Sequence, residues 1–548
     1  MRVADFFCGG GGFSEGFRQA GFKISFAVDK WKPAVDTFKA NKPGAKVILD
    51  DVIRLSNLPE EEFEAIIPDT EVIIGSPPCV AFSNSNKSGN GDKELGISLL
   101  EAYLKIIARK KFKENSILIY WALENVPNIK EYIKYEYRPS DFGLTGDWVL
   151  RPLNNLSKIY NAKYYGAPTN RKRFLCGEFP ELVETHSDDT VVPLKAVLES
   201  LGDPTDFEDI IIWDCNYPEL GINSHIISDH HYEHVLQRFE WEAAKRLKQD
   251  KGYMGRMSFP ENPDNPARTV MATLSSSSRE SMILGRKNGG YRLPTVREVA
   301  CMMSFPNDYR FCGTTEGTKY RLVGNAVPPK LSYALAKAML LDLGESVPSH
   351  YIKIKYNLKV PFVDLNNANI PPKTECSKRA TAKFKYHIPY LIYSAYRVEL
   401  TNYNSDFKSL QFKWNVEIHY SQGKKKANKF MPVPNIEFLD NYKKENIEKF
   451  IKSMQSELVG YNDFQKRYCM TSLERNNMLG PYELLSRVRE FIDEVYPTDE
   501  FRANIIRISE MPYELPVSIV VGYYILCRLV ENMGDKIDGY NDKESKTY

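Results

Sequence analysis

Short apolar runs alternate with helix-like segments over residues 1–180. The apolar runs predict strands at residues 3–7, 24–28, 47–49, 71–74 and 117–122, because their length and composition suit buried strands. The segments between them predict helices at residues 16–20, 33–40 and 97–110. Strand–helix alternation of this kind is typical of βαβ units, so we expect an α/β domain with a mostly parallel sheet.

Polar or glycine-rich residues stand where each predicted strand ends. In chain order they are Phe7–Gly12, Asp29, Asp51, Cys79 and Glu124–Asn125. Ligands of a parallel sheet bind at the carboxyl ends of its strands. We therefore expect these residues to share one ligand site.

The pattern changes in the rest of the chain. Residues 181–290 combine histidines, turns and a polar tract at 273–281, and helix-like patterning returns at residues 295–305 and 329–343. Residues 412–420 alternate like a half-buried strand. The longest apolar run, residues 515–530, contains Arg528 and is shorter than the roughly 18 residues of a membrane span, which favours a buried helix and no membrane partner.

Composition narrows the class of protein. A chain of 548 residues suggests about two to four domains. The 43% hydrophobic and 26% charged residues are typical of soluble globular proteins, and a net charge of +2 means that nucleic-acid binding would need a local basic surface. Nine scattered cysteines without a CxxC pair signal neither a disulfide framework nor a zinc site. The N-terminus lacks a signal-peptide layout, so we expect a cytoplasmic protein.

The segment "DFFCGGGGFSEGF", residues 5–17, runs from a strand through four glycines into a helix. Glycines let a ligand approach the backbone and free the amides at a helix start. No phosphate-binding lysine follows, which excludes a P-loop. Alone, such a loop is often only a turn. Asp29 suits the two hydroxyls of a ribose and Asp51 suits an adenine amino group, so together they indicate an adenosine-containing ligand.

The segment "VIIGSPPCVAFSNSN" ends a buried strand at Gly75 and places Cys79 behind two prolines. Prolines restrict the neighbouring backbone, so the thiol should lie on a stiff ledge, followed by a polar, glycine-rich loop. A rigid thiol beside a polar loop suits a nucleophile. The alternative is a small residue in a tight turn.

Two further segments carry charged side chains. "ALENVPN" places Glu124 in an apolar strand, where burial would raise the carboxyl pKa and favour a proton donor; a capping carboxylate is the alternative. "TNRKRF" alternates Arg171 and Arg173 on one side of a predicted strand. Their forked donors suit a base carbonyl or a phosphate, and a solvated basic edge is the alternative.

The chain resembles cytosine-5 DNA methyltransferases of the bacterial restriction–modification type. The likeness rests on "DFFCGGGGF", "GSPPCVAFS", "ENV", "YGAPTNRKRF", "RLPTVREVACMMSFPNDY" and "GNAVPP" in this order, and it covers residues 1–179 and 291–343. The resemblance implies the doubly wound class I fold that binds S-adenosylmethionine, with an inserted target-recognition domain. The implied domains are 1–180 and 291–345 for catalysis, 181–290 for recognition and 346–548 for an additional C-terminal domain of open role.

The resemblance also implies a covalent mechanism. Cys79 would attack C6 of a flipped-out cytosine, so that C5 becomes nucleophilic and takes the methyl group. Glu124 would bond or protonate N3, Arg173 would hold O2, and Asn125 would support the proline–cysteine ledge. Arg171 completes the expected catalytic set, and the polar loop after Cys79 would close over the base.

The remaining implied contacts fall into two groups. The cofactor set is Phe7, Gly9, Gly10, Gly12, Asp29, Lys30, Asp51, Val52, Pro78, Leu99, Asn325 and Ala326. The DNA set is Ser83, Ser85, Arg268, Thr269 and Val270, the last three from "NPARTVMAT". Two positions depart from the family pattern, since Val80 and Thr169 stand where relatives often have Gln.

The implied partners are double-stranded DNA and a cognate restriction endonuclease, in a prokaryotic or viral setting. No metal is expected, because the His230–His234 spacing lacks a third ligand and an accompanying acid. Two other functions stay open: methylation of tRNA by the same fold, and a catalytically silent DNA-binding regulator. The C-terminal region could be a dimerisation module, a DNA-contact module or a separate enzyme, although no acid–acid–lysine constellation stands out there.

Overall fold

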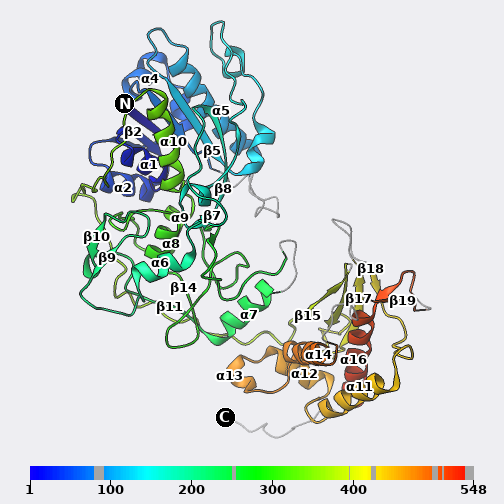
Figure 1. Ribbon diagram of the computed structural model, residues 1–548. Coiled ribbons are helices and arrows are strands. Elements are labelled where there is room, and N and C mark those ends of the chain that lie inside the picture. Colours follow the sequence, from blue (N-terminus) through cyan, green and yellow to red (C-terminus); the bar gives the residue numbers. More distant parts are fainter. Residues whose placement is uncertain are drawn as a thin grey trace, which may run out of the picture. The chain divides into compact units, whose positions relative to one another are not determined.

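The computed structural model describes residues 1–78, 92–249, 255–393, 395–420, 428–496, 504–508 and 511–536 (Figure 1). The chain forms two compact units. The first comprises residues 1–236 and 260–372, and the second comprises residues 237–259 and the chain from 373 onward.

A seven-stranded sheet organises the first unit, in the order β3-β2-β1-β4-β5-β8-β6. Its strands are β1 (Arg2–Phe6), β2 (Lys23–Asp29), β3 (Lys46–Leu49), β4 (Val72–Gly75), β5 (Tyr120–Asn125), β6 (Lys158–Asn161) and β8 (Lys172–Glu178). β1 to β5 are parallel, whereas β8 is antiparallel to both β5 and β6. The expected mostly parallel α/β sheet is confirmed.

Helices cover both faces of this sheet (Figure 1). One face packs against α1 (Gly12–Gln19), α2 (Lys32–Asn41) and α10 (Pro329–Asp342), and the other packs against α3 (Val52–Ser56), α4 (Glu60–Ile66) and α5 (Lys93–Lys111). The strand sequence explains the two layers, because side chains alternate between faces. Val72 and Ile74 join the core with α1 and α10, whereas Ile73 between them joins the core with α5.

One strand lies further along the chain than its apolar run suggests. We expected a strand at 117–122, but β5 begins at Tyr120 and ends at Asn125. Ile117 and Ile119 are exposed by 39% and 45%, so this part of the run does not enter the core. As a result Glu124 and Asn125 are the last two residues of the strand and do not belong to the loop beyond it.

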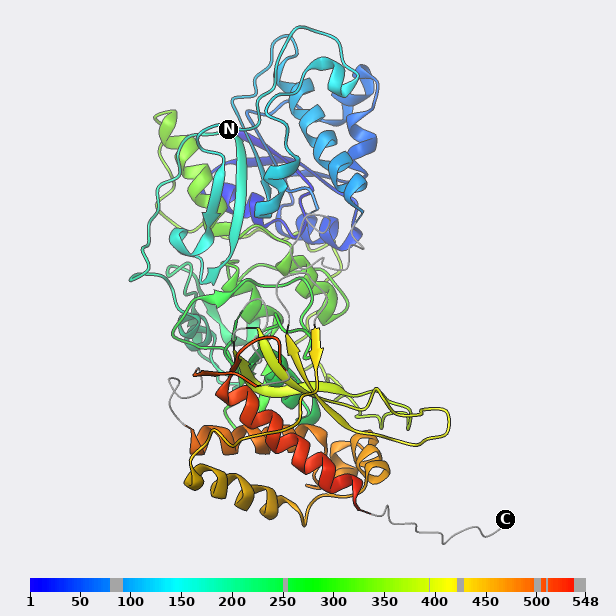
Figure 2. The same ribbon diagram turned by 90° about the vertical axis from the view of Figure 1, so that its right-hand side faces the viewer.

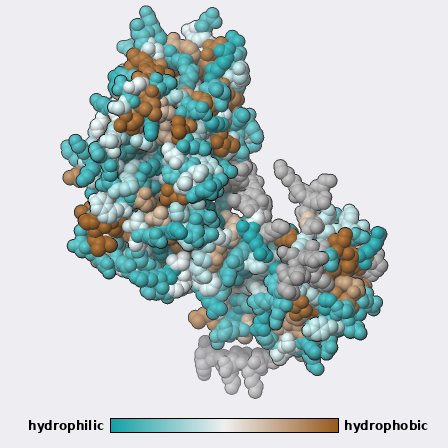
Figure 3. Space-filling view, in the orientation of Figure 1, coloured by the Kyte–Doolittle hydropathy of each residue, from teal (hydrophilic) through white to brown (hydrophobic). Residues whose placement is uncertain are grey.

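Smaller elements complete the first unit around a further apolar core. They are β7 (Thr169–Asn170), α6 (Leu194–Leu201), β9 (Ile211–Trp213), β10 (Gly221–Asn223), β11 (His234–Leu236), β12 (Ala267–Arg268), β13 (Leu284–Gly285), β14 (Tyr291–Leu293), α8 (Val296–Met302) and α9 (Glu316–Gly324), with short 3₁₀ turns at Pro127–Tyr132, Pro139–Phe142, Ala162–Tyr165 and Ser224–Ile226. Figure 3 shows a mainly hydrophilic surface with scattered apolar patches. Exposed Ile211 and Trp213 of β9 contribute to such apolar surface.

The unit boundaries differ from the expected domains. Residues 346–372 pack with the first unit: Asn357 N donates to Ala40 O at 2.9 Å, and Ile354 and Leu365 are buried in its core. Residues 237–259, including α7 (Arg238–Gln249), group with the second unit instead of with the inserted segment. The expected domains followed the family resemblance, whereas the observed units follow tertiary packing.

The second unit pairs an antiparallel sheet with helices. The sheet is β15 (Lys385–Tyr393), β16 (Tyr396–Thr401), β17 (Asn415–Tyr420) and β18 (Asn428–Phe430), in chain order. The other elements are α11 (Asn441–Met454), α12 (Tyr461–Cys469), α13 (Ser472–Arg475), α14 (Pro481–Val495), β19 (Ile505–Ile506), β20 (Leu515–Pro516) and α16 (Val517–Gly534). Figure 2 shows α16 in red against the yellow-green strands.

Helix α16 is the buried helix expected from the longest apolar run. Among the described residues it is the one helix that is long and apolar enough to cross a membrane, by length and composition alone. Its side chains at Ile519, Val521 and Leu526 are buried in the core shared with β15 to β17 and α14. Core packing therefore accounts for its hydrophobicity.

Candidate active site

The loop after β1 and the loop after β2 are joined by one carboxylate. Asp29 Oδ2 accepts a hydrogen bond from Gly9 N at 2.9 Å, and Asp29 Oδ1 accepts one from Trp31 N at 2.8 Å. Burial raises the pKa of this carboxyl. Phe7 adopts a φ of 56°, a left-handed conformation that is strained for an aromatic residue and is often found at functional sites.

Asp51 ends the loop after β3 and begins α3. Its Oδ1 accepts from Ile53 N at 2.9 Å, and its Oδ2 lies 2.7 Å from Lys30 Nζ. Burial raises the pKa of Asp51, but the hydrogen bonds from Lys30 and Ile53 lower it by more. The pKa of this carboxyl is therefore below its usual value. The neighbouring Val52 is buried. These predicted cofactor residues thus meet at one edge of the sheet.

The four glycines of the first loop have different surroundings. The nearest outside atom to a β-carbon built at Gly9 would be 3.9 Å away, which leaves open space. A β-carbon at Gly10 would lie 2.7 Å from Leu322 O, and one at Gly12 would lie 2.3 Å from Val327 O. Only Gly9 of these three has open space where a β-carbon would lie, whereas Gly10 and Gly12 are required by close packing of the chain on itself.

The other expected cofactor residues lie on separate segments. Asn325 is exposed where α9 ends, and Ala326 beside it is buried. Pro78 is exposed beyond β4, and Leu99 is half-buried on α5.

The proline ledge is held in place from β5. Asn125 Nδ2 donates to Pro77 O at 2.9 Å, and Asn125 itself is buried. β4 ends at Gly75, and Ser76 N donates back to Phe6 O at 3.2 Å. Cys79, Val80, Ser83 and Ser85 lie outside the described residues.

A buried ion pair lies beside the ledge. Glu124 Oε1 is 2.9 Å from Arg173 Nε, and Glu124 Oε2 accepts from Ser76 Oγ at 2.6 Å. Both charged side chains are almost fully buried. The antiparallel pairing of β5 with β8 brings them together, because Asn125 is in register with Phe174, the residue after Arg173.

Arg171 does not accompany Arg173. The predicted single strand is broken at Arg171, which lies between β7 and β8. Its Nη1 donates to Val270 O at 3.0 Å, and its Nη2 donates to Gly324 O and Ala326 O at 2.9 and 3.0 Å. The expectation that the two arginines share one side of a strand is therefore wrong, and Arg171 instead connects three backbone segments.

The predicted recognition core packs directly on the arginine segment. β12 pairs in parallel with β7, Thr169 Oγ1 donates to Arg268 O at 3.2 Å, and Thr269 Oγ1 donates to Asn170 O at 2.9 Å. Val270 is buried, and Arg268 Nε lies 2.8 Å from Glu261 Oε2. Thr169, which departs from the family pattern, is thus a fully buried link between the two segments.

The histidines of the inserted segment have separate partners. The ring nitrogens of His230 contact Thr295 Oγ1 and Leu201 O, while His234 Nδ1 lies 2.7 Å from Glu316 Oε2. Burial lowers the pKa of His230 to about 4, so the ring is neutral at pH 7. Each of these rings thus bonds partners from other elements of the first unit.

Sequence reasoning missed a polar cluster in the second unit. Glu399 on β16 is in register with Glu417 on β17, and His419 Nε2 lies 3.0 and 2.8 Å from their carboxylates. Lys385 Nζ is 3.0 Å from Glu399 and Lys429 Nζ is 3.0 Å from Glu417. The cations balance the two carboxylates. The alternating Glu417 and His419 were the visible signal, but their partners come from other strands.

Comparison with known proteins assigns most of the first unit to a protein family. The C-5 cytosine-specific DNA methylase family matches residues 1–341. The chain belongs to this family. The methylase region resembles the putative type II methyltransferase M.MJ0563P of Methanocaldococcus jannaschii, with 30% identity over 352 residues that cover 63% of this chain and 100% of the relative.

Two further proteins are similar to this chain. The type II methyltransferase M.MthTI of Methanothermobacter thermautotrophicus is 29% identical over 361 residues, covering 63% of this chain and 98% of the relative. A solved structure of a putative DNA modification methyltransferase encoded within an E. coli prophage covers 63% of this chain and 100% of its own, with 21% identity and a TM-score of 0.41.

The protein is thus a DNA (cytosine-5-)-methyltransferase, and it uses a methyl donor. The methylase match ends at 341, whereas the first unit continues to 372. Residues 342–372 are therefore an addition that packs with the methylase. Of the second unit, residues 237–259 fall within the family match, and the part from residue 373 onward lies outside it.

Proposed function

We propose that this methylase modifies C5 of cytosine in a specific double-stranded DNA sequence, with S-adenosylmethionine as donor and Cys79 as nucleophile. The observation that carries this proposal is the position of the proline ledge. Asn125 at the end of β5 fixes Pro77, and Glu124 beside it pairs with Arg173 of the neighbouring strand β8. The ledge that precedes Cys79 in the chain is therefore fixed next to a buried acid–base pair.

The residues at the sheet edge fit S-adenosylmethionine. Gly9 leaves open space at the backbone, and the carboxylates of Asp29 and Asp51 follow on the next two strands. The ligand's ribose hydroxyls and adenine amino group are hydrogen-bond donors that such carboxylates accept. Lys30, Val52, Pro78, Leu99, Asn325 and Ala326 would complete the site, together with Phe7, Gly10 and Gly12. When bound, the donor supplies an electrophilic methyl group.

Cys79 performs the nucleophilic step in this proposal. Its thiolate adds to C6 of the cytosine, and the electron pair of the C5–C6 double bond makes C5 nucleophilic. C5 then takes the methyl group, and loss of the C5 proton expels the Cys79 thiolate and restores the double bond. A thiol near pKa ~8.5 must lose its proton during or before the attack.

Glu124 and Arg173 bind the base in this proposal. Glu124 is held by Arg173 on one oxygen and by Ser76 on the other, so its carboxyl is fixed before the base arrives. It would donate a proton to N3 and so stabilise the charge that develops on the ring, and Arg173 would hold O2. Arg171 has a different role, because its guanidinium is committed to three backbone carbonyls. We assign it to positioning.

The target base must leave the duplex, because C5 and C6 are not accessible to these groups in stacked DNA. Thr269 and Val270 would approach the DNA from the segment paired with β7, with Arg268 beside them. Ser83 and Ser85 would contact the DNA from the loop after Cys79.

The relatives' names as type II methyltransferases support a role in restriction–modification. In that role the methylase protects its own target sequence from a partner endonuclease that cuts the same site. The proposed setting is the cytoplasm of a prokaryote, or of a cell infected by a virus that encodes the enzyme.

Transfer of labelled methyl groups tests the proposal. S-adenosylmethionine is offered in parallel with duplex DNA of mixed sequence and with total tRNA, using wild-type protein, Cys79→Ser and Cys376→Ser. Cys376 is exposed in the described chain and serves as the matched control. We expect label in DNA that is lost only in Cys79→Ser, and bisulfite mapping of the product then gives the target sequence.

Other outcomes separate the alternatives. Label in tRNA alone would assign the protein to RNA methylation. Full activity in Cys79→Ser would reject the covalent mechanism, and DNA binding without transfer to either substrate would favour a regulator.

A further inference from the structure

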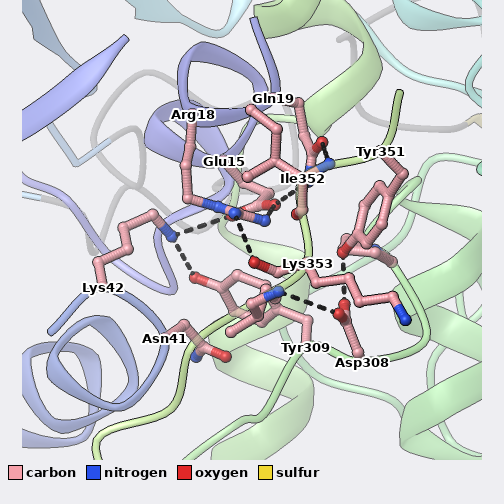
Figure 4. Close-up of polar contacts among 12 residues, drawn as sticks. Glu15, Arg18, Gln19, Asn41, Lys42, Asp308, Tyr309, Tyr351, Ile352 and Lys353 are labelled. Carbon is pink, nitrogen blue, oxygen red and sulfur yellow. Dashed lines mark hydrogen bonds and ion pairs between the residues drawn. The ribbon is translucent and has the colours of Figure 1, made fainter. Parts of the chain in front are cut away.

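The backbone of the glycine loop is held from two sides by side chains outside it. Tyr309 Oη donates to Gly10 O at 2.7 Å. Lys42 Nζ donates to Gly11 O at 3.3 Å and to Tyr309 Oη at 2.8 Å. Figure 4 shows the Lys42 ammonium and the Tyr309 hydroxyl facing each other. Two consecutive loop carbonyls are thereby fixed by one connected pair of side chains, the Lys42–Tyr309 pair.

Lys42 is buried as an ammonium ion. Its Nζ lies 4.9 and 4.7 Å from the ring centroids of Phe38 and Tyr309, and Glu15 Oε2 balances its charge at 3.3 Å. Burial lowers the pKa of Lys42 to about 8, and the pull of Glu15 in the opposite direction keeps the group mainly charged at pH 7. A buried charge is costly unless it makes specific bonds. An apolar side chain would fill this place at less cost, so the ammonium is explained by the bonds it makes.

Gly11 is explained by the same contacts. It has a φ of +80°, and a β-carbon there would lie 2.5 Å from Tyr309 Oη and 3.1 Å from Lys42 Nζ. Any larger residue would displace the pair. Glycine at position 11 therefore lets Lys42 and Tyr309 approach the loop backbone, whereas the space next to Gly9 stays open.

Residues beyond the family match complete the network (Figure 4). On α1, Arg18 bonds Glu15 and also donates to Lys353 O at 3.4 Å, while Gln19 exchanges bonds with the backbone of Ile352. Tyr351 donates to the Asp308 carboxylate next to Tyr309. The network that holds the loop thus joins α1, α2, residues 308–309 and residues 351–353, all within the first unit.

We propose that Lys42 and Tyr309 are positioning residues of the methylase, which fix the backbone at Gly9–Gly11 in the conformation that receives the methyl donor. This inference rests on the proposed S-adenosylmethionine site at that loop. Neither side chain touches the donor or the cytosine in this assignment. They act through the carbonyls of Gly10 and Gly11 and so preorganise the loop.

Direct binding measurements on the full-length protein test the inference. Isothermal titration with S-adenosylmethionine, without DNA, compares wild type with Lys42→Met, Tyr309→Phe and Lys23→Met. Lys42→Met keeps the aliphatic stem, Tyr309→Phe removes a single oxygen, and Lys23 is an exposed control at the amino end of β2. We expect the donor Kd to rise about tenfold or more in the first two variants, from the loss of charge-assisted or buried hydrogen bonds. The control should bind as wild type does.

Kinetics distinguish positioning from catalysis and from general damage. We expect the donor KM to rise with its Kd, while kcat at saturating donor stays within about threefold of wild type. An unchanged Kd in both variants, or a loss of kcat with an unchanged donor KM, would overturn the inference. If Lys42→Met fails to fold, Tyr309→Phe decides alone. Wild-type protein that binds no S-adenosylmethionine would instead refute the proposed cofactor site.

Discussion

Replacing Arg171 with Met keeps much of the aliphatic stem but removes a guanidinium that bonds three backbone carbonyls on two segments. The lost bonds are those to Val270 O, Gly324 O and Ala326 O, at 3.0, 2.9 and 3.0 Å. A buried hydrogen bond from a charged group contributes about 1.5–3 kcal/mol. Two of the three share Nη2, so their contributions do not simply add. We expect the free energy of unfolding of the first unit to fall by about 3–5 kcal/mol, as for other broken buried networks.

Urea denaturation followed by circular dichroism measures this change. The matched control is Arg151→Met, because the Arg151 side chain is 56% exposed and 3.5 Å from Glu136. That variant should stay within about 0.5 kcal/mol of wild type. Arg171→Lys should recover little, because one ammonium cannot replace the fork that reaches both Val270 O and Gly324 O.

The opposite result would refute the positional role of Arg171. If Arg171→Met unfolds at the wild-type urea concentration yet loses methyl transfer, the guanidinium acts on the substrate. Its three carbonyl contacts would then be dispensable, and the contrast drawn with Arg173 would fail.

Three other perturbations test separate parts of the molecule. Glu124→Gln keeps the shape of the side chain but removes the anion paired with Arg173. Single-turnover methyl transfer should therefore slow about 100-fold or more, while the donor Kd is unchanged. A rate within tenfold of wild type would contradict the proposed role of Glu124. Gly12→Ala should destabilise the protein by about 1–3 kcal/mol in urea denaturation, because its β-carbon would lie 2.3 Å from Val327 O. Gly44→Ala is the control and should not destabilise it, because no atom lies within 4 Å of a β-carbon there. Equal stabilities of the two variants would argue against close packing at Gly12. His230 has a folded-state pKa lowered to about 4, so the unfolded chain binds more protons and stability falls as pH drops from about 6.5 to 4. Between pH 7 and 5 the free energy of unfolding should fall by about 2 kcal/mol, and by less in His230→Gln. An unchanged pH dependence in that variant would be evidence against a buried neutral ring.

Much of the methylase fold could be predicted from local patterning. Five apolar runs became β1 to β5, and Val72, Ile73 and Ile74 of β4 alternate between the cores on the two faces of the sheet. The meeting of Gly9, Asp29 and Asp51 at one edge could be predicted as well, because parallel strands end at the same edge of a sheet. The family assignment followed from motifs in a fixed order, and the match over residues 1–341 confirms it.

The partners of individual side chains could not be predicted in this way. Arg171 and Arg173 are two residues apart, yet one bonds three carbonyls and the other pairs with Glu124, because the strand breaks between them. The glycines of the first loop look equivalent in sequence. Their separate roles depend on Leu322 and Val327, which come from the far end of the methylase region.

The same limit applies to boundaries and to buried charges. The expected domain boundary lay at 346, but the first unit extends to residue 372, and Ile354 and Leu365 are buried in its core. Lys42 has no signal in its own neighbourhood, and its partners Glu15 and Tyr309 are 27 and 267 residues away in the chain.

The sequence by itself determined the strand and helix periodicity, the order of the motifs and the chemistry available at the strand ends, because these depend on neighbours along the chain. Tertiary structure alone decided which carboxylate meets which cation, which glycine is open to a ligand and where each unit ends. These features are set by contacts between segments far apart in sequence, whose geometry depends on how all the layers pack at once.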